Sequence, residues 1–287
     1  NNRIAAEIRL PEAIDRKLLC PFQYFGVTDT VDLDHLKWAA GGYDKGELSR
    51  VYTLSGMTAN RRADLVVSSL LKYVTDIDDV KGLGFCVTVE HAEFMSNYFN
   101  GRGIPSMFLT GHSPDEERKE AKARLVKGEV RFIFVVDIYN EGVDIPEVNT
   151  VLFLRPTESL TVFLQQLGRG LRKANGKEYV VILDFIGNYN NNFMIPVALS
   201  GDRSYNADTI RKYVISGNNT IPGASTVHFD EIAKDRIFAS IDKIKGMKSI
   251  IRESYVSLKN RLGRVPYLLD FYENGEVDPL VIIKEYK

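Results

Sequence analysis

The sequence predicts an α/β fold in which a parallel β-sheet is covered by helices on both faces. Two observations predict it. The middle of the chain contains brief runs rich in Val, Ile and Phe, which are typical of buried strands, and longer amphipathic runs lie between them. Because strands that alternate with helices are joined by crossover connections, the strands are expected to run parallel.

Five apolar runs are the expected strands, and four amphipathic segments are the expected helices. The strands are predicted at 84–89, 106–109, 131–136, 150–154 and 179–183. The helices are predicted at about 58–75, 90–100, 114–127 and 159–172. Ser113 before Pro114 supports the third helix, as an N-cap followed by proline at the first helical position.

The chain divides into three predicted segments. Residues 1–47 are short and irregular, with prolines and a glycine-rich turn, residues 48–200 hold the α/β core, and residues 201–287 are mostly helical from about 207. The first residues, Asn1-Asn2-Arg3, carry neither an initiator methionine nor an apolar signal core. We therefore expect the chain to be a piece of a longer protein.

Composition excludes several classes of protein. No run approaches the roughly 20 apolar residues that a membrane span needs, so no membrane partner is expected. Cys20 and Cys86 form no C-x-x-C pair, so we expect a cytoplasmic protein without zinc or a disulfide framework. The four histidines lack metal-like spacing and are interpreted as ordinary surface or half-buried residues. The net charge of -1 does not by itself indicate nucleic-acid binding, which depends on local charge.

Two arginines three residues apart suggest an anion site at the end of the predicted helix 159–172. At 100° per residue, Gln165, Arg169 and Arg172 fall within about 60° of one another. The opposite side is apolar and consists of Leu160, Phe163, Leu164, Leu167 and Leu171. The alternative is an ordinary solvated face on a core helix. Gly168 and Gly170 each weaken a helix by about 1 kcal/mol. This cost favours the anion site, because glycines there would let a ligand approach closely.

A polar loop follows the predicted strand 131–136. Gly142, Asp144 and Pro146 lie in it, at the carboxyl end of a strand, where open α/β sheets bind ligands. One alternative is a Mg²⁺ site built from Asp137, Glu141 and Asp144, which would make the protein a metal nuclease. Another is a simple turn with acidic caps.

These segments resemble the motifs of one family, the second RecA-like domain of superfamily 2 helicases and translocases. "QQLGRGLR" resembles motif VI, Q-x-x-G-R-x-x-R, and "EGVDIP" resembles motif V. "GFCVTVEHA" resembles motif IV, with Thr88 at the strand-to-helix junction, and "LTGHSPDEERKEA" resembles the T-G segment with Thr110 and Gly111. The shared order of the four pieces makes the combination more specific than any one piece.

A closer resemblance, to bacterial DEAD/DEAH-type helicases of restriction or defence type, rests on two further segments. "EIRLPEAIDRKLLCPFQYFGV" is similar to the segment that follows motif III in those proteins, and "LGRVPYLLDFY" is similar to a helical C-terminal extension. Residues 1–47 are then the remnant of a first motor domain and its linker, and 201–287 a helical accessory region.

The resemblance implies the second motor domain of an ATP-dependent helicase or translocase. Arg169 and Arg172 would be arginine fingers that reach the γ-phosphate of ATP, which the first RecA-like domain holds with Mg²⁺. Gly142, Asp144, Gln165 and Gly168 would complete the nucleotide site, with Asp144 near the ribose. The chain has no G-x-x-x-x-G-K-[ST] phosphate loop, so it is expected to be inactive alone and to hold no metal.

The implied second ligand is nucleic acid, DNA rather than RNA. Thr88, Thr110 and Gly111 would contact it. The chain departs from the family pattern at two positions: Val136 stands where motif V often has threonine, and Gln166 where motif VI often has arginine. Both departures affect the expected backbone contacts but leave the two fingers intact.

The C-terminal region carries a basic stripe that is a further candidate. On a helix, Lys245, Lys248, Arg252 and Lys259 lie opposite Met247, Ile251, Leu258 and Leu262. Such a stripe, Lys248 and Arg252 above all, can bind phosphates, although a solvated helix face explains it equally well. The alternative function for the whole chain is a non-motor module that binds nucleic acid or protein. The retained Arg169 and Arg172 argue against it.

Overall fold

The computed structural model describes most of the chain. The described residues are 8–33, 35–36, 38–39, 42–53, 56–136, 145–157, 160–202, 204–216, 224–243, 247–273, 277 and 279–286. Within them, no helix combines the length and the apolar content that would let it cross a membrane.

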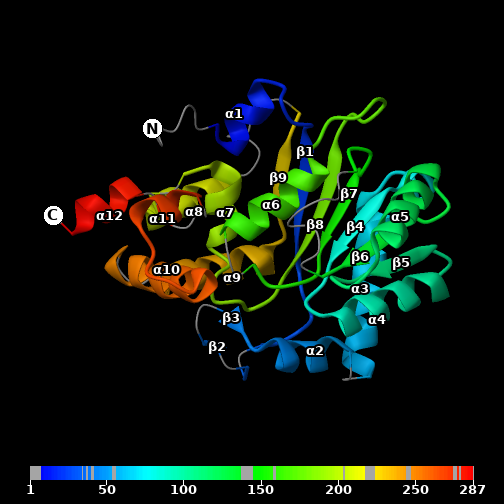
Figure 1. Ribbon diagram of the computed structural model, residues 1–287, viewed down its shortest axis with the longest axis horizontal. Coiled ribbons are helices and arrows are strands. Elements are labelled where there is room, and N and C mark those ends of the chain that lie inside the picture. Colours follow the sequence, from blue (N-terminus) through cyan, green and yellow to red (C-terminus); the bar gives the residue numbers. More distant parts are fainter. Residues whose placement is uncertain are drawn as a thin grey trace.

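A seven-stranded parallel sheet forms the centre of the molecule (Figure 1). Its order is β5-β6-β4-β7-β8-β1-β9, and each neighbouring pair is parallel. The strands are β1 (Phe22–Thr28), β4 (Gly82–Phe85), β5 (Ser106–Leu109), β6 (Phe132–Val135), β7 (Thr150–Phe153), β8 (Val180–Ile186) and β9 (Thr226–Phe229). A separate antiparallel pair is formed by β2 (Trp38–Ala39) and β3 (Gly42–Tyr43).

The helices follow the sheet strands in the predicted alternation. They are α1 (Leu10–Asp15), α2 (Lys45–Thr53), α3 (Met57–Tyr73), α4 (Val89–Gly101), α5 (Asp115–Lys127), α6 (Leu160–Gly170), α7 (Met194–Ser200), α8 (Ala207–Ser216), α9 (Glu231–Asp242), α10 (Met247–Leu262), α11 (Leu268–Glu273) and α12 (Pro279–Glu285), with a short 3-10 turn η1 (Ile77–Asp79). Every predicted strand and helix of the core is present, with ends that differ by a few residues.

The prediction that Ser113 caps the third core helix is wrong. Pro114 is the N-cap of α5, without a side-chain capping bond. The Ser113 hydroxyl instead accepts a hydrogen bond from the Thr110 amide at 3.1 Å. Because the hydroxyl closes the preceding turn, it is directed away from the first amides of the helix.

Helices cover both faces of the sheet, as predicted. One face packs against α3 and α4, through a core that includes Val66, Leu70 and Phe99. The other face packs against α1, α5, α6, α7, α8 and α9. Alternate residues of β6 point to opposite faces, since Phe132 and Phe134 belong to the first core and Ile133 and Val135 to the second.

The sheet extends beyond the predicted core segment. β1 lies between β8 and β9, although it belongs to the segment 1–47, and β9 belongs to the segment 201–287. The predicted boundaries therefore do not coincide with the edges of the sheet. The helices α10, α11 and α12 contact one another and lie on the side away from β5 (Figure 1).

A buried polar network holds the carboxyl ends of the central strands. The Arg62 guanidinium, on α3, donates to both carboxylate oxygens of Asp29 at 2.9 and 3.1 Å and to the Leu154 carbonyl at 3.0 Å. It also lies 3.3 Å from His91 Nε2 and 4.2 Å from the centre of the Tyr52 ring. Burial and the Arg62 charge lower the pKa of His91, so this histidine is neutral. The prediction that His91 is a surface or half-buried residue is wrong, since its side chain is fully buried.

We predict that Asp29→Ala destabilises the fold by about 3–5 kcal/mol, because it leaves the buried Arg62 charge without its counter-ion. Urea denaturation of the variant and the wild type measures the difference. The matched control is Arg102→Ala, which breaks an exposed ion pair with Asp64 and should cost much less. Equal losses of unfolding free energy in the two variants would show that the buried pair has no special role.

Candidate functional site

The two predicted arginines lie at the amino edge of the sheet. α6 follows the carboxyl end of β7 in the chain, runs back towards the amino edge and ends at Gly170. A Cβ placed on Gly170 would be 2.6 Å from Val151 Cγ2 and 3.4 Å from Val180 Cγ1, at the starts of β7 and β8. Residues 169–172, which we name the finger segment after the role proposed for them below, are therefore held against the first residues of two strands. In Figure 1 this edge is the one that α1 approaches.

The apolar side of α6 is buried, as its sequence predicts. Leu160, Phe163 and Leu167 are buried against the sheet, while Gln165 is exposed and Arg169 half-buried. The helix ends two residues earlier than predicted, so Arg172 lies beyond it and is not placed by the helical repeat. Gln166, the departure from the motif VI pattern, is buried and lines a small space beside the loop after β7.

Lys177, which the sequence analysis did not single out, contacts three backbone carbonyls in and near the finger segment. Lys177 Nζ donates to the carbonyl oxygens of Gly170 at 2.6 Å, Arg172 at 2.7 Å and Pro146 at 2.9 Å. Burial lowers the pKa of Lys177 to about 8, and the neighbouring Cys20 and Glu147 oppose this shift. The ammonium is therefore still protonated at neutral pH and can donate all three hydrogen bonds.

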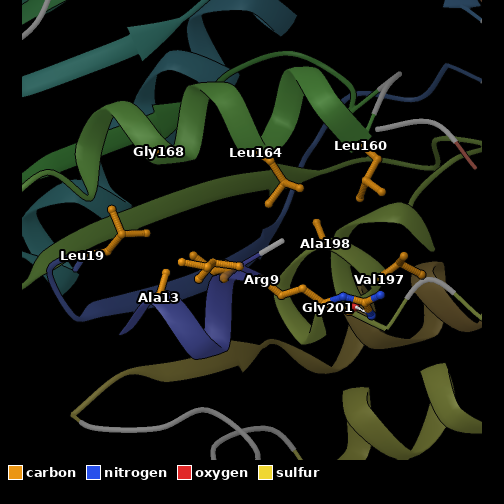
Figure 2. Close-up of a pocket in the computed structure, with 11 residues that line it drawn as sticks. Arg9, Ala13, Leu19, Leu160, Leu164, Gly168, Val197, Ala198 and Gly201 are labelled. Atoms are coloured by element: carbon orange, nitrogen blue, oxygen red, sulfur yellow. Dashed lines mark hydrogen bonds between the residues drawn. The ribbon is translucent and has the colours of Figure 1, made fainter. Parts of the chain in front are cut away.

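Gly168 borders an apolar pocket of 230 Å³ between α1, α6 and α7 (Figure 2). Leu160 and Leu164 line the same wall, and Arg9 lies at the rim, where its Nη1 donates to the Gly201 carbonyl at 2.6 Å. A Cβ at Gly168 would have no atom within 4 Å. Gly170 is therefore required by packing against the sheet, whereas Gly168 is not required by any packing among the described residues.

Thr88, Thr110 and Gly111 lie at the opposite, carboxyl edge. Thr88 follows β4 and Thr110 follows β5, and the sheet places these strands on either side of β6. At the usual spacing of strands, the two segments are roughly 10 Å apart. The carboxyl end of β6, where the motif V segment begins with Val136, lies between them. The structure thus brings together the ends of three predicted motifs.

The Thr88 hydroxyl already has partners. It caps α4 by accepting from the His91 amide at 3.3 Å, and it lies 2.8 Å from Ser49 Oγ. The pKa of Glu90 is lowered by hydrogen bonds from its own amide and from the Thr88 hydroxyl. Thr88 therefore fixes the start of α4 and would have to share its oxygen with any ligand.

The turn after β5 is open to solvent. The Thr110 hydroxyl accepts from the His112 amide at 3.2 Å, and a Cβ at Gly111 would meet no atom within 4 Å. Arg118, on α5, donates to the Gly111 carbonyl at 2.9 Å, while its buried Nε has no hydrogen-bond partner among the described residues. The turn therefore combines exposed backbone with a nearby cation, which belongs to the same T-G segment.

The described part of the basic stripe of the C-terminal region lies on α10, as predicted. Lys248 and Arg252 are exposed, whereas Ile251 and Leu258 are buried. Lys248 Nζ lies 5.9 Å from the centre of the Tyr286 ring. Arg252 lines a groove of 370 Å³, with Ile251, Tyr255, Pro266, Leu268, Phe271, Ile282 and Tyr286. Lys245 lies outside the described residues.

The remaining predicted site residues also lie outside the described part of the chain. They are Gly142 and Asp144 of the motif V segment, together with Asp137 and Glu141 of the alternative Mg²⁺ site. Among the residues that are described, no group of three or more His, Cys, Asp or Glu could hold a metal ion.

Comparison with known sequences supports the motif assignments. Residues 66–174 match the family described as the helicase conserved C-terminal domain, and residues 251–287 match a domain of unknown function, DUF8090. The chain is 28% identical over 193 residues to the putative ATP-dependent helicase IRC3 of Saccharomyces cerevisiae. It is 35% identical over 104 residues to UvrABC system protein B of Treponema pallidum.

The match covers only part of each relative. For IRC3 it includes 67% of this chain and 27% of that protein, and for UvrABC system protein B 33% and 15%. Among solved structures, the yeast DEAD-box splicing factor Prp28 is 13% identical, with a TM-score of 0.48 over 79% of this chain and 39% of that chain. The type ISP restriction-modification enzyme LlaBIII, bound to DNA, is 16% identical, with a TM-score of 0.46 over 90% and 20%. Similarities this distant carry no argument about function.

We predict opposite effects of alanine at the two glycines of α6. Gly170→Ala should lower stability by about 1–3 kcal/mol, because its methyl group would overlap Val151. Gly168→Ala should raise stability by up to about 1 kcal/mol, because alanine favours the helix and the space is open. Thermal denaturation of both variants checks this. A destabilised Gly168→Ala variant would contradict the packing described here.

Proposed function

We propose that this chain, whose residues 66–174 match the helicase conserved C-terminal domain, is the second motor domain of an ATP-dependent nucleic-acid helicase or translocase. The observation that carries the proposal is the separation of the candidate sites. Arg169 and Arg172 lie at the amino edge of the sheet, and Thr88, Thr110 and Gly111 lie at the carboxyl edge. One rigid sheet between two ligands is what a motor domain needs to couple nucleotide to nucleic acid.

At the amino edge, Arg169 and Arg172 are proposed as arginine fingers for the γ-phosphate of ATP. A guanidinium is planar and permanently charged, so it can stabilise the oxygens of a transferring phosphoryl group. Gln165 is exposed on the same helix and can reach the same ligand. We also assign nucleotide contacts to Gly168, Gly142 and Asp144, on the resemblance to motifs V and VI.

A second RecA-like domain must complete this ATP site. The proposed fingers supply cations, but this chain has no G-x-x-x-x-G-K-[ST] phosphate loop to cradle the phosphates. We therefore propose that Mg²⁺ and the β- and γ-phosphates are held by another domain. On this proposal the chain alone does not hydrolyse ATP.

At the carboxyl edge, the turns after β4 and β5 are proposed to follow the nucleic-acid backbone. Gly111 offers exposed backbone beside Arg118, and helix α4 begins just after Thr88. Backbone amides at a helix start and a nearby cation both favour phosphate. DNA rather than RNA as the substrate, and a cytoplasmic location, stay predictions of the sequence.

The C-terminal helices are proposed to extend the nucleic-acid track. Lys248 and Arg252 are exposed on α10 beside tyrosines 255 and 286. Cations next to aromatic rings suit a strand whose phosphates and bases are both accessible. A photoreactive DNA strand that never labels α10 would remove this region from the proposed track.

We predict that Arg169→Ala and Arg172→Ala each lower the nucleic-acid-stimulated kcat of the intact protein by at least about 10²-fold. The loss arises because the fingers act on the transition state. Arg→Lys should restore little, since an ammonium cannot reproduce the planar fork. Steady-state ATPase assays and melting temperatures, measured side by side, check the prediction.

Two results would contradict the proposal. A kcat near that of the wild type would mean that the arginines are not fingers. A fall in kcat that only follows a large fall in melting temperature would make them structural. If nucleic acid still binds while the wild-type intact protein never hydrolyses ATP, the alternative of a non-motor binding module is favoured instead.

A further inference from the structure

The backbone carbonyls at the end of α6 need hydrogen-bond donors from outside the helix. The last carbonyls of a helix have no partner within the helix. Here those carbonyls belong to the finger segment, so their satisfaction decides how the finger arginines are held. The Leu171 carbonyl accepts from the Cys20 amide at 2.7 Å, at the entry to β1.

Lys177 satisfies the carbonyls on either side. Its ammonium donates to the carbonyls of Gly170 and Arg172, and also to that of Pro146, which lies at the far end of the motif V segment. Gly176, with φ of +77°, turns the chain so that a residue five positions after Arg172 can reach back to it. A cation is favourable at this point because the carboxyl end of a helix carries partial negative charge.

We propose that Lys177 is a positioning residue, which fixes the finger segment and joins it to the loop that precedes β7. The inference rests on the proposed function for Arg169 and Arg172. The restraint itself does not depend on that function, because three hydrogen bonds from one ammonium hold the backbone of two neighbouring motifs. Through the Pro146 carbonyl, Lys177 also ties the carbonyls of Gly170 and Arg172 to the chain that enters β7.

Lys173 provides the matched control. It lies in the same segment and donates to the Lys17 carbonyl at 3.0 Å, on the surface and away from the carbonyls of Gly170 and Arg172. Lys173→Met removes the same charge and donors as Lys177→Met, but none of the contacts to the finger segment. Lys177→Gln keeps part of the donor capacity and guards against a variant that fails to fold.

The test is made on the intact protein and has two readouts. Lys177→Met should raise amide hydrogen exchange at residues 169–173 at least about 10-fold, while exchange in β4 and α4 is unchanged. It should lower the stimulated kcat by about 10-fold to 100-fold, the loss that a displacement near 1 Å produces, with KM for ATP within about 3-fold. Lys177→Gln should fall between, and Lys173→Met should match the wild type.

The outcomes separate this inference from the proposed function. Unchanged exchange at 169–173 in folded Lys177→Met or Lys177→Gln protein overturns the inference. So does an unchanged kcat in those variants when Arg172→Ala abolishes turnover, and the proposed function then stands. If Arg172→Ala itself leaves turnover intact, the finger assignment fails, while the exchange comparison still decides whether Lys177 holds the segment.

Discussion

The buried ion pair between Arg62 and Asp29 is the constraint on which the carboxyl edge depends. Asp29 directly follows β1, and Arg62 lies on α3, so the pair joins β1 to a covering helix. The same guanidinium bonds the carbonyl of Leu154 after β7, and Tyr189 after β8 donates to Asp29 at 3.2 Å. A fully desolvated arginine tolerates little displacement of these partners, since each lost contact leaves a charge in an apolar core.

Further hydrogen bonds fix the carboxyl ends of β1 and β8. Arg236, on α9, donates to the carbonyls of Asp29 and Ile186, at the ends of β1 and β8. Asp230 caps α9 and accepts from the Thr28 amide at 2.7 Å. The carboxyl ends of neighbouring strands therefore have fixed relative positions. On the proposed function, this edge offers nucleic acid an ordered surface, while Lys177 holds residues 169–172 at the amino edge.

The sequence predicts the parallel core well because its strands and helices have strong local patterns. It predicts 84–89 for β4, which spans Gly82–Phe85, because Gly82 is a poor strand former and the apolar run continues past Phe85. A Cβ at Gly82 would lie 2.1 Å from the Phe132 ring, so a contact with β6 requires the glycine there. β1 and β9 are not predicted. Each pairs with a strand that is far away in the chain, and that pairing has no local signal in the sequence.

The candidate site is predictable only in part. The motif resemblance identifies Arg169 and Arg172, and helical periodicity correctly separates Gln165 from the buried leucines. Lys177 and the Arg62–Asp29 pair have no local signal. From sequence alone, an isolated lysine after a turn is expected on the surface. Arg62 is likewise expected on the polar side of a helix, because Asp29, its partner, lies 33 positions away in the chain.

Photoaffinity mapping of the intact protein tests the central claim that the two ligands bind at opposite edges of one sheet. An ATP analogue with a photoreactive group on its γ-phosphate and a photoreactive DNA strand would be crosslinked separately, and the labelled peptides identified by mass spectrometry. The account predicts nucleotide labels within residues 160–177 and DNA labels within 86–113 and on α10 (Met247–Leu262). Nucleotide labels at 86–113, or DNA labels confined to 160–177, would contradict it.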